Sequence, residues 1–342
     1  MKAWLLNGIS NLDEVSNPLE LAEVPMPEPK DFEIRIKVSC CGICHTELDE
    51  IEGRTPPGKY PIIPGHQVVG IVEKCGNQTQ IFKDGDRVGV AWIFGACGQC
   101  EYCVAGLENL CPEFRATGRD RNGGYAQFMV VDERFAYRIP STFSDVEAAP
   151  LLCAGAIGYR SLRLTGISDG QTLGLTGFGA SGHLVMKMSL HMYPKSPVYV
   201  FARNKGEQQF ARDLGATWAG QITDSPPQDT NAIIDTTPVW TTVVGSLLHL
   251  KPGGRLIINA IRKESNDLDA LLKISYQDHL WMEKEIKSVA NITRSDVFEF
   301  LNLAASIPIK PAVVTYPFSK ANKAIMDLKQ KHVKGAKVLV VN

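Results

Sequence analysis

Apolar and polar residues alternate in the first part of the chain as they do in half-buried strands. Residues 32–38 (FEIRIKV) alternate strictly, and residues 67–73 (QVVGIVE) and 87–91 (RVGVA) are short β-branched runs. A turn signal, DGD at residues 84–86, separates the last two runs. The first 150 or so residues are therefore predicted to be rich in strands.

Near residue 155 the pattern changes, because short apolar strands begin to alternate with helical stretches. Four strands are predicted there, at residues 172–176, 198–201, 232–235 and 255–259. Such alternation predicts a parallel sheet covered by helices. Beyond residue 290 we expect a helix near 295–305 and a terminal strand at 337–341. The run 284–287 (KEIK) is interpreted as a solvated helix face.

Length and composition limit the classes of protein that fit. The 342 residues predict two domains, and 44% hydrophobic with 21% charged residues is typical of a globular protein. The net charge of -1 gives no electrostatic footprint for nucleic acid or an anionic membrane. We find no signal peptide and no stretch near the length of a membrane span, so a cytoplasmic location is expected. The nine cysteines are therefore interpreted as reduced thiols and metal ligands.

Four cysteines are spaced as C-x2-C-x2-C-x7-C, and they are Cys97, Cys100, Cys103 and Cys111. Four thiolates complete a tetrahedral zinc shell, which is the pattern of a structural site. This zinc is expected to stabilise a loop and to take no part in chemistry. The alternative is a finger that binds a partner, which a single lobe without a basic surface does not favour.

A glycine fingerprint, GFGASG at residues 177–182, follows the predicted strand 172–176 and precedes a helical stretch at 183–191. Gly177 suits a tight turn, Gly179 a close approach to a pyrophosphate, and Gly182 close packing of helix on strand. Three glycines often mark only a turn. In this strand–turn–helix context they predict nucleotide binding.

The next strand, residues 197–201, lacks the acidic residue that would hold the adenine ribose of NAD. Ala202, Arg203, Asn204 and Lys205 follow it instead. Since a guanidinium can pair with a 2′-phosphate, we expect NADP to be preferred over NAD. The alternative is that Arg203 and Lys205 are ordinary solvated loop cations.

Three further residues, Cys44, His66 and Cys153, each lie close to a glycine in the sequence. Each has an ordinary interpretation on its own, because free cysteine is commonly buried and a single histidine is commonly just a satisfied polar group. Their spacing alone does not join them into a site.

Together, the motifs resemble those of the zinc-dependent medium-chain alcohol dehydrogenases, in particular the cinnamyl and simple alcohol dehydrogenases. The resemblance runs essentially end to end through CGICHT (41–46), PGH (64–66), GDRVGVAW (85–92), GGYAQF (123–128), PLLCAG (150–155), GFGASG (177–182) and DLGA (213–216). It implies an α/β fold. A GroES-like, β-rich catalytic domain would contain residues 1–154 with the four-cysteine lobe. A Rossmann domain with a doubly wound parallel sheet would contain residues 155–290, and residues 291–342 would return to the catalytic domain.

The same resemblance implies roles for individual residues. Cys44, His66 and Cys153 would bind a catalytic zinc, so that each chain would hold two zinc ions. Thr46 would take the substrate proton, His45 would face the cofactor pyrophosphate, and Glu47 would orient the ring of His66. Trp92 would line the substrate pocket, although a core or domain-edge tryptophan is the alternative.

The implied activity is hydride transfer between a primary or secondary alcohol, or its aldehyde or ketone, and a nicotinamide cofactor. The partners would be a small-molecule substrate and further copies of the chain, as a homodimer or homotetramer, with no nucleic acid and no membrane. One alternative is a polyol dehydrogenase of the same family, in which Glu is common where Cys153 stands. Another is a non-catalytic relative that only binds, which the presence of all three ligands disfavours.

Three residues beside the ligands depart from the family pattern. Gln67 replaces the usual Glu after the ligand His, and Glu47 replaces the usual Asp. Asp49 stands where many members have a relay His, so the outer proton path is expected to differ. A neutral Gln67 is expected to alter metal exchange or the electrophilicity of the metal.

Overall fold

The structure, a computed structural model, describes residues 1–307, 309–330 and 335–341. The chain divides into two compact units: unit 1, residues 1–153 and 292–342, and unit 2, residues 154–291. The division predicted from the sequence, at 154/155 and 290/291, differs from this one by one residue at each boundary. The predicted C-terminal segment includes residues 308, 331–334 and 342, which lie outside the described residues.

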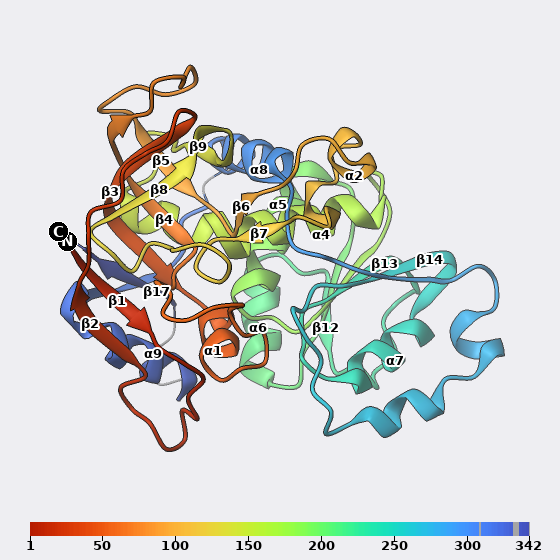
Figure 1. Ribbon diagram of the computed structural model, residues 1–342. Coiled ribbons are helices and arrows are strands. Elements are labelled where there is room, and N and C mark those ends of the chain that lie inside the picture. The colour runs from red at the N-terminus through yellow and green to blue at the C-terminus, as the bar shows by residue number, and fades with distance from the viewer. Residues whose placement is uncertain (308, 331–334, 342) are drawn as a thin grey trace. The chain divides into compact units, whose positions relative to one another are not determined.

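Unit 1 is built on a seven-stranded sheet in the order β16-β17-β3-β4-β5-β9, with β8 also paired to β3 (Figure 1). All pairs are antiparallel except β16 with β17. Alternate residues of β3 form the core, since Ile34, Ile36 and Val38 are each at most 2% exposed. The strands are β3 (Glu33–Ile43), β4 (Gln67–Cys75), β5 (Arg87–Val90), β8 (Phe128–Asp132), β9 (Ala136–Arg138), β16 (Val313–Pro317) and β17 (Ala336–Val340).

Two small ribbons and several helices complete unit 1. The ribbons are β1 (Lys2–Leu6) with β2 (Leu19–Glu23), and β6 (Ile93–Gly95) with β7 (Arg115–Ala116). The helices are α1 (His45–Ile51), α2 (Glu101–Val104), α3 (Asp145–Pro150), α8 (Arg294–Ser306) and α9 (Ala321–Lys329). Short helical turns occur at Glu108–Leu110, Glu133–Phe135, Leu151–Gly155 and Phe318–Lys320.

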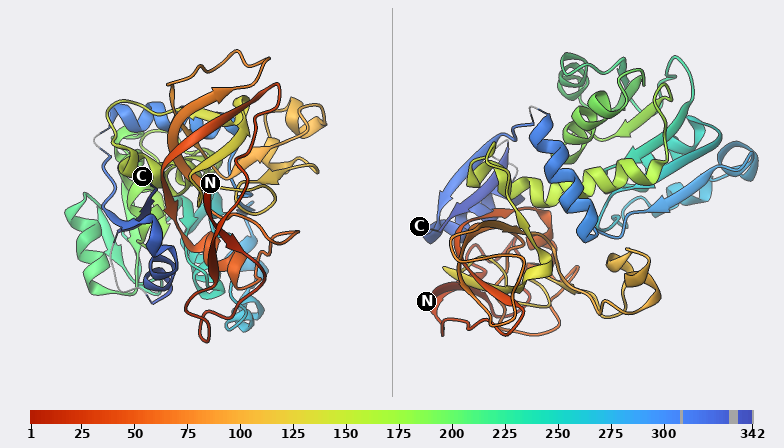
Figure 2. Two further views of the ribbon diagram at one scale, coloured as in Figure 1. Left: turned by 60° about the vertical axis from the view of Figure 1, so that its left-hand side comes forward. Right: turned by 90° about the horizontal axis from the view of Figure 1, so that it is seen from above.

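Unit 2 contains a six-stranded parallel sheet in the order β12-β11-β10-β13-β14-β15. Helices flank its strands (Figure 2). The strands are β10 (Leu173–Thr176), β11 (Val198–Phe201), β12 (Trp218–Gly220), β13 (Thr230–Asp235), β14 (Leu250–Ile258) and β15 (Glu285–Ser288). The helices are α4 (Ala156–Thr165), α5 (Ala180–Met192), α6 (Lys205–Asp213) and α7 (Trp240–Leu248), with turns at Leu268–Lys273 and Tyr276–Leu280.

The strand order reverses between β10 and β13. The chain runs from β10 outward through β11 and β12 to one edge, then returns to β13 and runs outward through β14 and β15 to the other. In open parallel sheets, ligands bind outside the carboxyl ends of the strands at this switch point. The glycine fingerprint begins at Gly177, directly after β10, and so lies at this point.

The predicted α/β class, with a strand-rich domain and a Rossmann-type doubly wound parallel sheet, is confirmed. One local interpretation was wrong: residues 284–287 are not a helix face. Residues 285–288 form β15, the outer strand of the parallel sheet, and all four are exposed. Among the described residues, no helix combines the length and the apolar character that crossing a bilayer needs.

Candidate metal and cofactor sites

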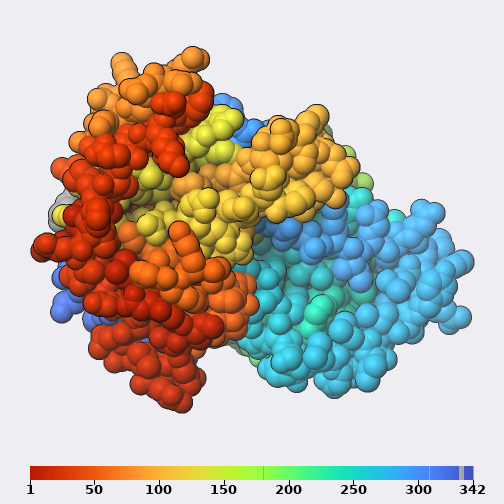
Figure 3. All heavy atoms as spheres, viewed as in Figure 1, coloured from red at the N-terminus to blue at the C-terminus, as the bar shows by residue number. Residues whose placement is uncertain are grey.

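The four-cysteine lobe brings its four sulfur atoms together. Cys97, Cys100, Cys103 and Cys111 place their sulfurs within 4.8 Å of one another, and the Cys97 and Cys103 sulfurs are 3.9 Å apart. A tetrahedral zinc with Zn–S bonds of about 2.3 Å separates its sulfurs by about 3.8 Å. The lobe lies on the surface of the face shown in Figure 3, where its atoms are gold. The sulfur geometry therefore fits one zinc ion.

The thiols of this lobe differ in proton affinity. Backbone N–H groups of Gln99 and Cys100 lower the pKa of Cys97 to about 7. Burial and the neighbouring thiols raise the pKa of Cys103 to about 12. The backbone of Cys100 donates to the Cys97 sulfur at 3.3 Å, and that of Glu113 to the Cys111 sulfur at 3.3 Å. These donors stabilise thiolate charge, which is the form that binds zinc.

Three elements that are distant in sequence bring Cys44, His66 and Cys153 together. Cys44 caps the amino end of α1, His66 directly precedes β4, and Cys153 lies in the π-helical turn Leu151–Gly155. The Cys44 sulfur is 3.6 Å from His66 Nε2 and 3.9 Å from the Cys153 sulfur, and all three donor atoms lie within 4.8 Å of one another. Tetrahedral zinc would require about 3.6 Å for an S–N pair and about 3.8 Å for an S–S pair. The three donors therefore fit zinc with one position left open.

Glu47 contacts both His66 and Cys44 on the side away from their donor atoms. Its Oε1 lies 2.6 Å from His66 Nδ1, and its Oε2 accepts a hydrogen bond from the Cys44 backbone N–H at 2.8 Å. The Glu47 side chain is 0% exposed and that of His66 1%. With Nδ1 facing the carboxylate, the ring presents Nε2 to the sulfurs.

The charges of the trio favour a cation between the donors. Contact with the Cys153 sulfur, together with burial, raises the pKa of the Cys44 thiol well above its ordinary value. Burial by itself lowers the pKa of His66, but Glu47 and Cys44 outweigh it and raise that pKa well above the ordinary value. Without a cation, the neighbouring sulfur and burial therefore disfavour the Cys44 thiolate. A divalent cation would neutralise two thiolates there.

The glycine fingerprint has the backbone that its proposed roles require. Gly177 has a φ of +77°, and a Cβ on Gly182 would lie 2.8 Å from the Gly177 carbonyl oxygen. A Cβ on Gly179 would meet nothing within 4 Å, so the space above it is open. Helix α5 begins at Ala180 with Gly179 as its cap, so its free backbone N–H groups face this space.

The end of β11 carries no acidic side chain. Ala202 follows it and is buried, Arg203 is exposed, and Asn204 caps α6 through a hydrogen bond to the Gly206 backbone N–H. The positions nearest the strand end therefore offer a guanidinium and no carboxylate to a ribose.

Comparison with known proteins identifies the family. The family profile described as "Alcohol dehydrogenase GroES-like domain" matches residues 30–141. A "Probable alcohol dehydrogenase AdhA" of Mycobacterium tuberculosis is 39% identical over 100% of this chain and 97% of its own length. The chain belongs to the zinc-type medium-chain alcohol dehydrogenase family. As a member of this family it interconverts alcohols and aldehydes with a nicotinamide cofactor.

Two further relatives are cinnamyl alcohol dehydrogenases. "Cinnamyl alcohol dehydrogenase 2" of Arabidopsis thaliana is 36% identical over 70% of this chain and 68% of its own length. Among solved structures, a cinnamyl alcohol dehydrogenase of Sorghum bicolor superposes with a TM-score of 0.85 at 26% identity, covering 99% of this chain and 97% of that one.

The residues that depart from the family pattern are all buried. Gln67 is 3% exposed, and a Cβ on Gly42 would lie 2.5 Å from its Oε1, so Gly42 makes room for this amide. Asp49 is 3% exposed and accepts a hydrogen bond from Arg54 Nε. Asp49 is therefore engaged in an ion pair with Arg54, at the position where the family resemblance led us to expect a different outer proton path.

Sequence reasoning missed Glu50, which is 1% exposed. Burial and the nearby Glu47 raise the pKa of Glu50 to about 8, while His66 acts most strongly against that rise. Glu50 lies four residues after Thr46, on the same face of α1. That spacing in the CHTELDE segment is the signal that could have drawn attention to it.

Three further side chains with predicted roles are Thr46, His45 and Trp92. The Thr46 backbone N–H donates to the Cys44 sulfur at 3.5 Å, and His45 is exposed at the first residue of α1. Trp92 is half-buried, with the Phe114 ring centroid 5.4 Å away and the Arg119 guanidinium 5.0 Å from its own centroid. Their catalytic roles stay predictions.

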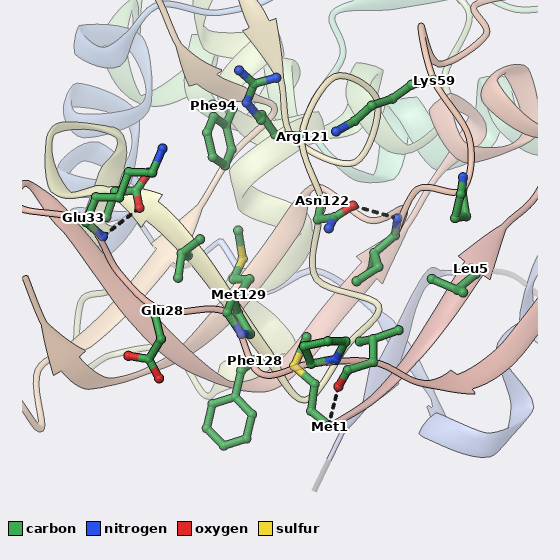
Figure 4. A pocket seen from close by; sticks show the side chains of 17 residues that line it. Met1, Leu5, Glu28, Glu33, Lys59, Phe94, Arg121, Asn122, Phe128 and Met129 are labelled. Atoms are coloured by element: carbon green, nitrogen blue, oxygen red, sulfur yellow. Dashed lines mark hydrogen bonds between the residues drawn. The ribbon is translucent and has the colours of Figure 1, made fainter.

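A separate cavity of about 460 Å³ in unit 1 is not the metal site (Figure 4). None of its lining residues is a cysteine or a histidine. Of its acidic residues, Glu28 is paired with Arg35 and Lys74, and Glu33 accepts from the Lys30 backbone N–H.

Proposed function

We propose that this alcohol dehydrogenase binds two zinc ions per chain, one for catalysis at Cys44, His66 and Cys153 and one for stability in the four-cysteine lobe. The separations of 3.6 and 3.9 Å from the Cys44 sulfur to the other two donors carry this proposal. They suit a tetrahedral ion whose fourth position is open to substrate.

When bound, zinc would supply a Lewis acid that lowers the pKa of an alcohol or polarises a carbonyl, and the nicotinamide would carry the hydride. Glu47 keeps the His66 ring in one orientation, through the contact of 2.6 Å to Nδ1. The Thr46 hydroxyl takes the substrate proton. Because Asp49 is engaged with Arg54, the proton then reaches solvent by a path other than Asp49.

NADP(H) is the proposed coenzyme. The end of β11 presents the exposed Arg203 and no carboxylate, which favours a 2′-phosphate over a free 2′-hydroxyl. Backbone N–H groups at the start of α5 would bind the pyrophosphate above Gly179. Steady-state kinetics with NADPH against NADH decide the preference.

We also propose that two chains associate through β15. All four residues of this outer strand are exposed, and Ile286 is 43% exposed. An exposed edge strand with an apolar side chain can pair with a second copy of itself. Light scattering should report a dimer for the native chain and a larger monomer fraction for Ile286→Lys. A native chain that is monomeric at all concentrations would exclude this interface.

The zinc proposal is tested by following oxidation of the reduced nicotinamide with a panel of aldehydes, cinnamaldehyde included, before and after chelation. Metal content is measured on the same samples. We expect activity to fall as zinc leaves Cys44, His66 and Cys153 and to return when zinc is restored. Undiminished turnover after zinc has left the trio would contradict the proposal. A cytoplasmic location remains a prediction from the sequence.

A further inference from the structure

A buried ion pair lies beside the glycine fingerprint, at the carboxyl ends of three neighbouring strands. Asp235 is the last residue of β13, and Lys263 follows β14. Lys263 Nζ donates to Asp235 Oδ2, and the two side chains are 7% and 0% exposed. In the sheet, Asp235 is the register partner of Thr176, the residue before Gly177. The pair therefore occupies the switch point of the sheet.

The other oxygen of Asp235 is fully used by hydroxyl groups. Its Oδ1 accepts from Thr176 Oγ1 at 2.5 Å, and the Thr237 and Thr242 hydroxyls lie 2.9 and 3.0 Å from it and 2.5 Å from each other. Both oxygens of this buried carboxylate are therefore satisfied. The Asp235 side chain thus contacts the end of β10, the segment after β13 and the start of α7.

The hydrogen-bond donors of Lys263 are likewise all engaged. Besides Asp235, its Nζ donates to the Thr237 carbonyl oxygen at 2.8 Å and to the Val239 carbonyl oxygen at 3.2 Å. An ammonium group has three donors, so none remains for a ligand. The role open to Lys263 is to hold the backbone of residues 237–239 in place.

Residues 236 and 237, at the start of this backbone segment, pack against the turn of the glycine fingerprint. The Thr236 hydroxyl donates to the Thr176 carbonyl oxygen at 3.0 Å. A Cβ on Gly177 would lie 2.9 Å from Thr236 Oγ1 and 3.0 Å from Thr237 Cγ2. Residues 236 and 237 thus pack against Gly177. If this segment shifted, the turn at Gly177 could move, and with it the backbone N–H groups at the start of α5.

We propose that Lys263 and Asp235 are positioning residues for the nicotinamide cofactor, a role that rests on the proposed binding of NADP(H) at the fingerprint. They hold residues 236–239 against Gly177, so that the pyrophosphate-binding backbone is formed before the cofactor arrives. They act through the backbone and do not touch the cofactor.

The test compares cofactor affinity in Lys263→Met with that in the native chain. Binding of NADPH is measured by calorimetry, well below the melting temperature of each protein. A second ligand, adenosine 2′,5′-bisphosphate, contains the adenine end of NADP but no pyrophosphate bridge. We expect the Kd of NADPH to rise about tenfold, which is about 1.4 kcal/mol, while the Kd of the fragment changes less than about twofold. If NAD(H) proves to be the coenzyme, NADH and AMP replace the two ligands.

Arg255→Met is the matched control, because it breaks the pair of Arg255 with Glu285 between β14 and β15 in the same sheet. It should leave both affinities unchanged. Equal loss for NADPH and the fragment in Lys263→Met, or no loss for either, would overturn the positioning role. If Lys263→Met does not fold, the double variant Asp235→Asn with Lys263→Met removes both charges. Unchanged NADPH affinity in this double variant would also overturn the positioning role. A native chain that binds neither nicotinamide coenzyme refutes the proposed function instead.

Discussion

Replacing Glu47 by Gln tests whether this buried carboxylate sets the metal affinity of the trio. Gln keeps the size of the side chain and an oxygen that can accept from the Cys44 backbone N–H, so the cap of α1 is retained. What changes is the charge 2.6 Å from His66 Nδ1. The variant therefore isolates the effect on the histidine ligand.

The size of the effect follows from the contact and its burial. Loss of a partner that orients a metal-bound histidine costs about 10–100-fold in metal affinity, or about 1.4–2.7 kcal/mol. Because Glu47 is 0% and His66 1% exposed, water screens the contact little. We expect the upper part of that range.

Competition with a chromophoric chelator measures this change. One of the two proposed zinc ions should be lost at lower chelator concentration in Glu47→Gln, while the other is unaffected. Glu133→Gln is the control, because Glu133 is also buried in unit 1 but accepts from the backbone N–H groups of Gln80 and Ile81 at 2.8 and 2.7 Å. Equal zinc affinity in the native chain and Glu47→Gln would refute the orienting role.

Three further predictions concern the neighbours of the sites. Gln67→Glu should exchange zinc faster at unchanged zinc content, measured with isotopic zinc, and indistinguishable exchange and turnover would contradict it. Arg203→Glu should raise KM for NADPH at least about tenfold and leave KM for NADH nearly unchanged, since it sets a carboxylate against the 2′-phosphate. The raised pKa of Glu50, about 8 against an ordinary 4.5, means that its contribution to stability is complete below about pH 4.5 and is lost as the pH rises toward 8. Glu50→Gln should therefore melt increasingly above the native chain between about pH 5 and pH 8, and a gain that does not grow with pH would rule this out.

The sequence pattern predicted helices and strands well where the element is buried in the core. The strand predicted at 198–201 has those bounds, and the helix predicted at 183–191 is the central part of α5. The error at 284–287 has a physical reason: β15 is an outer strand with every residue exposed, so its charged sequence carries no burial pattern. An alternating apolar pattern arises where one face of a strand is buried, and no residue of β15 is buried.

The sites divide in the same way. The four-cysteine lobe is local, so its spacing alone predicted it, whereas the trio came together only through the family resemblance. Asp235 and Lys263 are separated by 28 residues, and nothing in either local sequence indicates that they pair. Long-range buried polar contacts of this kind depend on how strands are ordered in the sheet, which local pattern does not determine.

The central claim, that Cys44, His66 and Cys153 hold a catalytic zinc, is tested most directly with Cys153→Ser. Zinc content, turnover and NADPH affinity are measured on the same preparation. We expect zinc to fall from about two to about one per chain and turnover to be lost, while NADPH still binds. Native turnover in a variant that has lost this zinc, or native zinc content with native turnover, would contradict the claim.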